Sequence, residues 1–221
     1  SVLSSTDFTL NDYPLIFAIL IPWNFGDSAT LIACAFKIFT LVCNKHVVLP
    51  ETEHQIQLVK LLLSFTSQTA DINVSLSSID LLWTIVNILT FEATLWEIFF
   101  QCLLDAIVDK RADISICVTR SLFSLITSNL SQVPQKSLDM LIDTQFRGVI
   151  SSFKESELSS LLNAYLVELT HFLCTFEFMT DELASDIIST QVDLCCSTDK
   201  EDLAENGFQT FEEFFLSQKC S

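Results

Sequence analysis

The chain has 221 residues, a formal net charge of −17 and a mean hydropathy of +0.46. Three glycines and four prolines are too few for the tight hairpins of a many-stranded β fold. Half of the residues are hydrophobic, yet the sequence contains no uncharged apolar run of about 18 residues, the length that spans a bilayer. The composition therefore predicts an all-α protein whose helices are buried against one another.

Acidic residues are concentrated towards the C-terminal end of the sequence. From Glu157 onward there are thirteen aspartates and glutamates but only two lysines, Lys200 and Lys219. A surface of this charge repels the phosphates of nucleic acids and of anionic lipids. It suits either a solvated outer face or a surface that receives a basic protein partner. We therefore expect protein partners, no nucleic acid, and membrane association only through partners or other regions.

Acidic residues that could cap helices recur at a regular spacing. Four stretches begin in this way, at Asp27, Asp71, Asp113 and Asp202. A large apolar side chain lies twelve positions after each of them, namely Phe39, Trp83, Leu125 and Phe214. The double gap before Asp202 predicts another copy that begins at Glu157 and has Leu169 at the same offset. The resulting period of 42 to 45 residues is typical of HEAT and armadillo repeats.

The stretch from Asp71 to Leu89 is predicted to be a central helix of this series. Asp71 can accept hydrogen bonds from the free N–H groups of the first turn. The spacing predicts that one side of the helix carries Ile72, Leu76, Ile79, Trp83 and Val86. Leu82, Ile85 and Leu89 widen this apolar stripe, so the helix needs neighbours on more than one side.

Amphipathic partner helices are predicted between the capped stretches, at residues 51–68, 93–109, 134–153 and 182–195. Each has one apolar face and cannot be stable alone, so it must pack against its neighbour. We therefore predict a HEAT/armadillo-type α-solenoid of about five helical-hairpin repeats over residues 27–221, as a fragment of a longer chain. Residues 1–26 are expected to supply an incomplete leading repeat.

Parts of the sequence resemble the Mon-two (monensin-sensitivity-two) family. Residues 71–83, DINVSLSSIDLLW, are similar to that family's segment DINISLTSIGLLWN. The order of the family's LW…DPRPAVRKSAGQTLFS segment is followed by Leu95-Trp96, Asp109, Arg111 and Leu122-Phe123-Ser124. Glu201-Asp202-Leu203-Ala204 and the following Phe211 resemble the later EVSLAAINCL repeat. The chain departs from the pattern at Asp80, Thr84 and Ser115-Ile116, where the family has Gly, Asn and an Arg-Lys pair.

Mon-two proteins are large Golgi and endosome scaffolds related to the BIG-type guanine-nucleotide exchange factors for Arf GTPases. The resemblance implies a non-enzymatic scaffold or adaptor segment in vesicle-mediated protein transport between Golgi and endosomes. It also implies a cytoplasmic protein that lies peripherally at those membranes. The partners implied are a Dopey-type scaffold, an Arf-like small GTPase and, indirectly, an aminophospholipid flippase.

Two other functions fit the same repeat pattern. The chain could be the regulatory C-terminal repeat region of a BIG-type Arf exchange factor, in which case an exchange domain would lie upstream. It could also be a karyopherin-like cargo-binding solenoid, because acidic helical repeats suit basic cargo. Binding to basic localisation peptides would favour this second alternative.

The sequence contains none of the motifs that mark common catalytic, nucleotide or metal sites, such as G-x-x-x-x-G-K-[ST], G-x-S-x-G or H-E-x-x-H. The eight cysteines form no C-x-x-C pair, and no histidine lies at a zinc-finger spacing from them. We expect reduced thiols in a cytosolic setting. The sequence thus predicts no enzyme and no catalytic, cofactor-binding or metal-binding residues.

Two further features have ordinary structural interpretations. His171, at the edge of a helix rich in Leu and Phe, is interpreted as a structural histidine. An aromatic stripe at helical spacing is formed by Phe208, Phe211, Phe214 and Phe215. Core packing explains this stripe most simply, and a groove for a partner helix is the alternative. The residues that bind partners remain unknown from the sequence.

Overall fold

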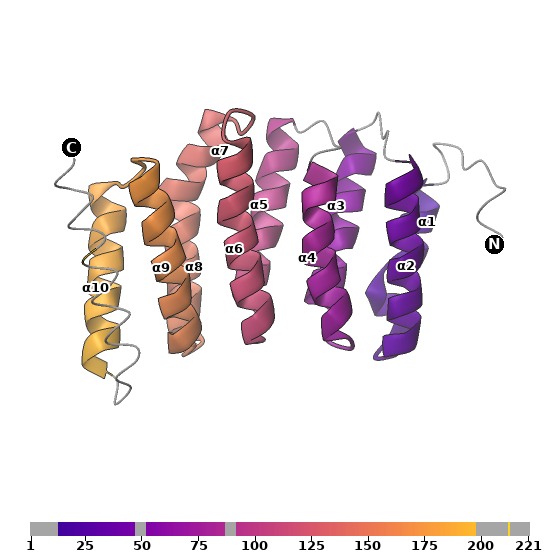
Figure 1. Ribbon diagram of the computed structural model, residues 1–221, viewed down its shortest axis with the longest axis horizontal. Coiled ribbons are helices and arrows are strands. Elements are labelled where there is room, and N and C mark those ends of the chain that lie inside the picture. The colour runs from indigo at the N-terminus through magenta and orange to yellow at the C-terminus, as the bar shows by residue number, and fades with distance from the viewer. Residues whose placement is uncertain (1–12, 47–51, 87–91, 198–211, 213–221) are drawn as a thin grey trace. The chain divides into compact units, whose positions relative to one another are not determined.

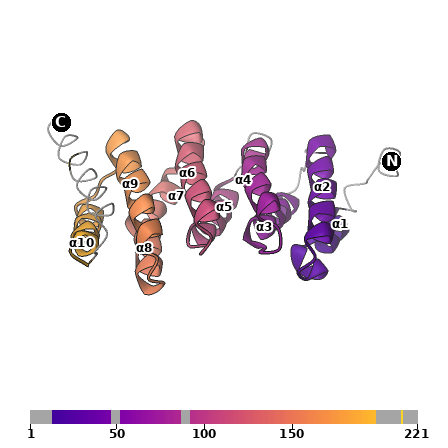
Figure 2. The same ribbon diagram turned by 60° about the horizontal axis from the view of Figure 1, so that its bottom comes forward.

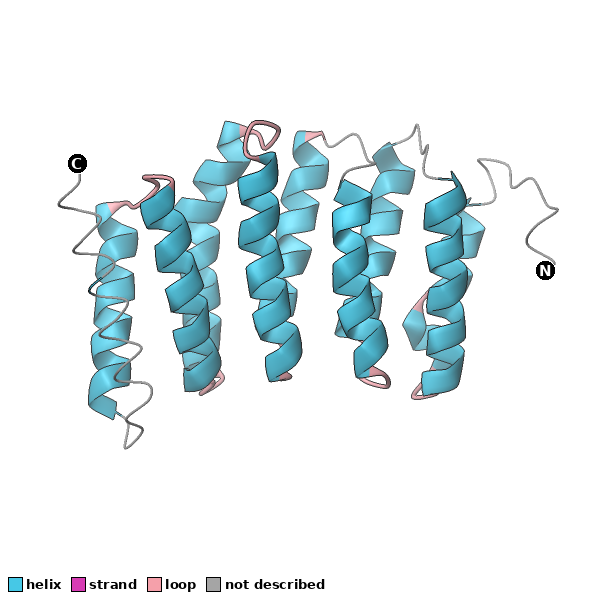
Figure 3. Ribbon diagram, viewed as in Figure 1, coloured by secondary structure: helices cyan, strands magenta, loops and turns pink. Residues whose placement is uncertain are grey.

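The computed structural model describes residues 13–46, 52–86, 92–197 and 212, and every regular element within these ranges is helical (Figure 3). The predicted all-α class is therefore confirmed for this part of the chain. The chain divides into two compact units, Ser1–Ala106 and Ile107–Ser221.

The helices of the first unit lie in two layers (Figures 1 and 2). They are α1 (Tyr13–Leu20), α2 (Ala29–His46), α3 (Thr52–Ser67), α4 (Ile72–Val86) and α5 (Ala93–Ile107), with a short 3₁₀ turn, η3 (Pro22–Phe25). α2 packs against α4 in one layer, α1 packs against α3 in the other, and α3 packs against α4 across the layers. Phe39 of α2 joins the layers, because its ring lies 6.5 Å from that of Phe17 and 5.6 Å from that of Phe65.

The second unit is built around α9. Its elements are α6 (Ala112–Asn129), α7 (Gln135–Met140), η4 (Leu141–Gln145), α8 (Phe146–Glu155), α9 (Ser159–Thr175) and α10 (Asp181–Ser197). α9 packs against α6, α8 and α10 (Figure 1). The ring of Phe123 on α6 lies 5.1 Å from that of Phe172 on α9 and 5.7 Å from that of Phe146 on α8. One aromatic cluster therefore holds three helices together.

α7, η4 and α8 follow one another without a break. η4 is a π-helical turn, in which the backbone N–H of Phe146 donates to the carbonyl oxygen of Leu141, five residues earlier. Ion pairs then join α8 to α10: Arg147 contacts Asp186 and, at 3.2 Å, Glu182. Lys154 lies 4.0 Å from Asp193. These pairs are partly exposed, so each contributes little to stability.

The predicted partner helices agree with α3, α5, the stretch from α7 to α8, and α10. Their predicted ends differ from the observed ends by no more than two residues. The pattern worked because each of these helices buries one continuous apolar face. The π turn in the third of them was not predicted, since it leaves the apolar residues Leu141, Ile142 and Phe146 all buried.

The capping residue predicted for α4 is confirmed. The Oδ1 atom of Asp71 accepts hydrogen bonds from the backbone N–H groups of Asn73, at 2.9 Å, and Val74, at 3.4 Å. The carboxylate thus supplies partners that the first turn of a helix lacks. The capping residue predicted for α2, Asp27, is wrong by one position. The helix begins at Ala29, and the side-chain oxygen that accepts from the N–H of Leu31 in its first turn is Oγ of Ser28.

The predicted caps of the next two copies are also wrong. α6 begins directly after Arg111, so Asp113 lies inside its first turn, where the helix dipole favours a carboxylate. α9 begins directly after Leu158, and Glu157 belongs to the turn before it. Asp202 lies outside the described residues. An acidic residue near a helix start therefore marks the helix without fixing which residue caps it.

The buried face of α4 differs from the predicted stripe. Ile79 is fully buried, but Ile72 is 40% exposed and Trp83 is partly exposed. The interior instead receives Ser75 and Ser78, which are both 0% exposed. At the equivalent offset in other copies, the large side chains are fully buried: Phe39, Leu125 and Leu169. Phe214 lies outside the described residues.

A left-handed residue closes the turn between α8 and α9. Glu157 has φ of 55°, its N–H donates to Lys154, and the N–H of Leu158 donates to the carbonyl of Phe153. This is the Schellman arrangement, in which glycine is usual because a Cβ atom is disfavoured at positive φ. Glu177, with φ of 57°, ends α9 in a related turn.

We predict that Glu157→Gly stabilises the protein by about 1 kcal/mol, because glycine removes the cost of a left-handed Cβ. The free energy of unfolding measured in urea checks this. Glu157→Ala removes the same charge but keeps the Cβ atom, so it should give no gain. An equal gain in both variants would assign the effect to charge and contradict the backbone explanation.

Trp96, rather than Trp83, is the tryptophan whose loss should damage the core. It is 0% exposed, and its ring lies 5.3 Å from that of Phe100 and 5.9 Å from that of Phe99. We expect Trp96→Ala to cost about 3–5 kcal/mol in the free energy of unfolding. Trp83→Ala should cost clearly less, and Trp23→Ala, at a side chain 70% exposed, should cost little. Equal costs at the three positions would contradict this burial pattern.

Candidate functional site

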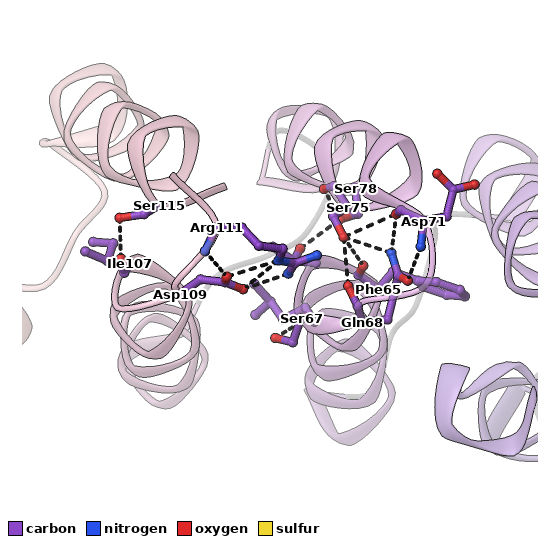
Figure 4. A network of polar contacts seen from close by, with 12 residues as sticks. Phe65, Ser67, Gln68, Asp71, Ser75, Ser78, Ile107, Asp109, Arg111 and Ser115 are labelled. Atoms are coloured by element: carbon purple, nitrogen blue, oxygen red, sulfur yellow. Dashed lines mark hydrogen bonds and ion pairs between the residues drawn. The ribbon is translucent and has the colours of Figure 1, made fainter. Parts of the chain in front are cut away.

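Buried polar side chains close the turn between α3 and α4 (Figure 4). Gln68, 3% exposed, donates from Nε2 to the carbonyl oxygen of Asp71 at 2.5 Å and to Oγ of Ser75 at 2.8 Å. Its Oε1 accepts from the backbone N–H of Asp71 at 2.9 Å. The hydroxyl oxygens of Ser78 and Thr66 lie 2.8 Å apart in the same interface. Their hydrogen-bonding capacity is used by the fold, so this network is structural.

The turn between α5 and α6 uses related chemistry within the second unit (Figure 4). Ser115 donates to the carbonyl oxygen of Ile107 at 2.6 Å. It is the fourth residue of α6, as Ser75 is of α4. Arg111 donates through two nitrogen atoms to the carboxylate of Asp109, with Nη2 2.6 Å from Oδ2. The Oδ1 atom of Asp109 also accepts from the backbone N–H of Arg111 at 2.8 Å.

The carboxyl group of Asp109 has a lowered pKa. Burial raises its pKa, but the side-chain and backbone hydrogen bonds from Arg111 and the charge of Arg111 outweigh this effect. The net pKa is below the ordinary value of 3.8. Asp109 is therefore a charged structural residue at neutral pH and not a candidate acid or base.

Open grooves lie between neighbouring helices in each unit. In the first unit, a largely apolar groove of about 620 Å³ lies between α2 and α4. In the second unit, a groove of about 470 Å³ lies between α8 and α10, lined by the paired charges of Arg147 and Asp186. The space between α6 and α9 holds two cavities, of about 340 and 390 Å³. We refer to these two together as the α6–α9 groove.

The α6–α9 groove runs along two parallel helices. Ser115 and Leu161 line one of its cavities, and Thr127 and Thr175 line the other. Between them, Nε of Arg120 lies 3.0 Å from Oε1 of Glu168. The arginine side chain is 69% exposed and the glutamate side chain 33%. This ion pair lies at the rim and divides the groove into its two cavities.

The first cavity, which we name the polar cavity, is lined by two residues that each carry a buried polar atom without a partner in the described part of the chain. Asn163 is 3% exposed and Tyr165 is 1% exposed. The Oδ1 atom of Asn163 and the hydroxyl of Tyr165 make no hydrogen bond within the described part of the chain. Burial also raises the pKa of Tyr165 well above its ordinary value, so its hydroxyl stays protonated. Both atoms are fully buried, so they lie behind the wall of the cavity and do not face its open space.

The second cavity, which we name the aromatic cavity, is lined by Phe123, Phe172 and Phe176 together with His171. The rings of Phe172 and Phe176 lie 5.4 Å apart. His171 was interpreted as a structural histidine, but its side chain is exposed at the cavity wall. The α6–α9 groove therefore offers a polar and an aromatic compartment side by side.

Periodicity did not identify the residues of the α6–α9 groove. Asn163 and Thr170 lie on the apolar stripe of α9 with Leu166 and Leu173, and all four are buried. A polar residue on an apolar stripe was the one local sign of this site. Arg120 and Glu168 gave no sign, because single charges on helices usually mark a solvated face.

The described residues contain no group of three or more His, Cys, Asp or Glu side chains that could hold a metal ion. No disulfide joins the cysteines in these ranges. Cys43 is 0% exposed, and burial raises its pKa to about 12. Cys34 and Cys196 are exposed. None of the helices in the described ranges is long and apolar enough to cross a bilayer.

Comparison with known proteins gives no match: no protein-family model, curated protein or solved structure is similar enough to place the chain in a family.

We predict that Asp109→Asn costs about 1–3 kcal/mol at pH 7, because Arg111 loses its charged acceptor. Since the folded pKa is lowered, this stabilisation is present above the unfolded value near 3.8 and is lost as the pH falls through the folded pKa. Urea unfolding of both proteins between pH 7 and pH 2.5 should show their difference shrinking below about pH 3.8. Asp80→Asn, at an exposed position, serves as the control.

Thiol labelling should separate the cysteines by burial. Iodoacetamide at pH 8 is expected to modify Cys34 and Cys196 in the native protein, because both are exposed. Cys43 should react only after denaturation, since its thiol is buried and protonated at this pH. Mass mapping of peptides measures this. Native labelling of Cys43 at the rate of Cys34 would show that α2 is packed differently.

Proposed function

We propose that the chain is a segment of a HEAT/armadillo-type α-solenoid that binds other proteins and catalyses no reaction. The spacing of the second helices of successive pairs supports the repeat: α2, α4, α6 and α9 begin at residues 29, 72, 112 and 159, at intervals of 43, 40 and 47 residues. Repeats of this length stack so that each covers the apolar face of its neighbour.

The α6–α9 groove is the observation that carries the binding role. It lies between parallel helices of one layer, and it combines a polar cavity with an aromatic cavity. Grooves of this kind between helices receive segments of partner proteins. The net charge of −17 favours partners with basic surfaces.

The sequence resemblance supports a more specific role as a scaffold or adaptor segment in vesicle transport between Golgi and endosomes. Under this proposal the chain is cytoplasmic and reaches the membrane through partners. The candidate partners are a Dopey-type scaffold and an Arf-like small GTPase, with an aminophospholipid flippase joined indirectly. The helices hold a surface in place for these partners and take no part in chemistry.

Binding to purified candidates tests this proposal. We expect the chain to bind the Dopey-type scaffold or the GTP-loaded Arf-like GTPase in titration calorimetry, and a tagged chain to concentrate at Golgi or endosomal membranes in cells. Ser124→Arg places a bulky charge at the exposed wall of the α6–α9 groove and should weaken binding at least tenfold. Ser185→Arg makes the same change at an exposed position of α10 and should leave binding intact.

Absence of binding to both candidates, together with diffuse distribution in cells, would overturn the scaffold role. The full reading frame that contains this chain distinguishes the scaffold role from the BIG-type alternative. An Arf exchange domain encoded in the same frame would contradict the scaffold role and favour the BIG-type alternative.

A further inference from the structure

The helix α1 exposes large apolar side chains to solvent. Leu15 is 65% exposed and Ile19 is 56% exposed, and their spacing along the sequence places them on one side of the helix. Tyr13, Phe17 and Leu20 are buried on the other side. A helix at a protein surface normally carries polar residues on its exposed side, so the outer face of α1 differs from an ordinary solvated face.

The short turn η3 extends this apolar surface. Trp23 is 70% exposed. The Nδ2 atom of Asn24 donates to the carbonyl oxygens of Ala18, at 2.8 Å, and Ile19, at 3.2 Å, which holds η3 against the last turn of α1. These bonds also satisfy two of the carbonyl groups that the end of a helix leaves free. We refer to Leu15, Ile19 and Trp23 together as the α1 patch.

The surroundings of the α1 patch carry no charge of their own. No charged residue lies between Tyr13 and Gly26 in the sequence. The helix α3, which packs against α1, instead exposes the charged residues Glu53 and Lys60. The α1 patch therefore combines exposed apolar side chains with a locally neutral surface and with satisfied backbone carbonyl groups.

These properties match the interfacial region of a lipid bilayer. A standard protein–protein interface takes about 20–30 residues on each side, far more than the α1 patch provides. A bilayer needs no matching shape, and its interface favours tryptophan beside aliphatic side chains where backbone polar groups are satisfied. α1 has eight residues, whereas about 20 are needed to span a bilayer, so the contact is with one surface of the membrane.

We propose that the α1 patch inserts into the surface of a lipid bilayer whose headgroups carry no net charge. Leu15 and Ile19 reach the acyl chains, and Trp23 lies at the level of the headgroups. The net charge of −17 disfavours anionic lipids, so zwitterionic headgroups are selected. This inference goes beyond the proposed function, in which partners bring the chain to a membrane, by adding a direct contact with lipid.

The test uses the whole chain and vesicles made either of phosphatidylcholine or of equal parts of phosphatidylcholine and phosphatidylserine. We expect saturable binding to the neutral vesicles in a flotation assay, and at least tenfold weaker binding to the anionic ones. Phosphatidylcholine brominated near the headgroup end of its acyl chains should quench the fluorescence of Trp23. The variant Trp23→Phe should still bind but lose this quenching, because Trp83 and Trp96 lie outside the α1 patch.

A matched pair of substitutions tests the position of the contact. Ile19→Gln should weaken binding to neutral vesicles about tenfold, because one inserted aliphatic side chain is lost. Val192→Gln makes a similar change at a side chain of α10 that is 46% exposed, and it should leave binding unchanged. Both positions are exposed, so circular dichroism should show the native helix content in each variant.

Three results would overturn the proposal: no binding to neutral vesicles, equal loss of binding in Ile19→Gln and Val192→Gln, or quenching that persists in Trp23→Phe. Self-association without vesicles that Ile19→Gln abolishes, measured by sedimentation equilibrium, would also overturn it and assign the α1 patch to a second copy of the chain. Binding of protein partners is measured without lipid and with Ser124→Arg, so the outcome for the α1 patch is distinguishable from the outcome for the α6–α9 groove.

Discussion

Chain reversal with very little glycine is the constraint on which the structure depends. The sequence has three glycines, and of those in the described ranges only Gly26, with φ of 55°, lies in a turn at positive φ. In the described ranges, Glu157 and Glu177 take positive φ in two further turns, and side chains close two others. Gln68 and Asp71 close one turn, Asp109 and Arg111 another. Because these polar groups are partly or fully buried, helix pairing and turn formation stabilise each other.

The sequence was more informative about the helices than about the residues at which they begin. Amphipathic faces predicted the helices well, because a continuous apolar face has one periodicity and must be buried. The starts of the helices were harder, because a carboxylate is favoured both at the N-cap and within the first turn. Asp71 lies at the N-cap of α4, whereas Asp113 lies within the first turn of α6. Composition does not distinguish these two cases.

Ser75 and Ser78 show a different limit. A serine counts as polar in any periodicity, yet both are fully buried, because their hydroxyls bond to groups of α3 and α4. The apolar stripe predicted for α4 was therefore correct at Ile79, Leu82, Ile85 and Val86, but it included Ile72 and Trp83 in place of these serines. The α6–α9 groove lies beyond sequence patterns for a simpler reason. Arg120 and Glu168 are 48 residues apart, and only the packing of their helices brings them together.

The π-helical turn at Leu141–Gln145 sets the direction in which α8 presents its charges. A hydrogen bond that spans five residues adds one residue to the turn. In an α-helix one residue corresponds to a rotation of about 100° about the axis. Without the extra residue, Arg147 and Lys154 would be rotated by this amount away from the carboxylates of α10. The single residue added in this turn thus determines that Arg147 and Lys154 of α8 face α10.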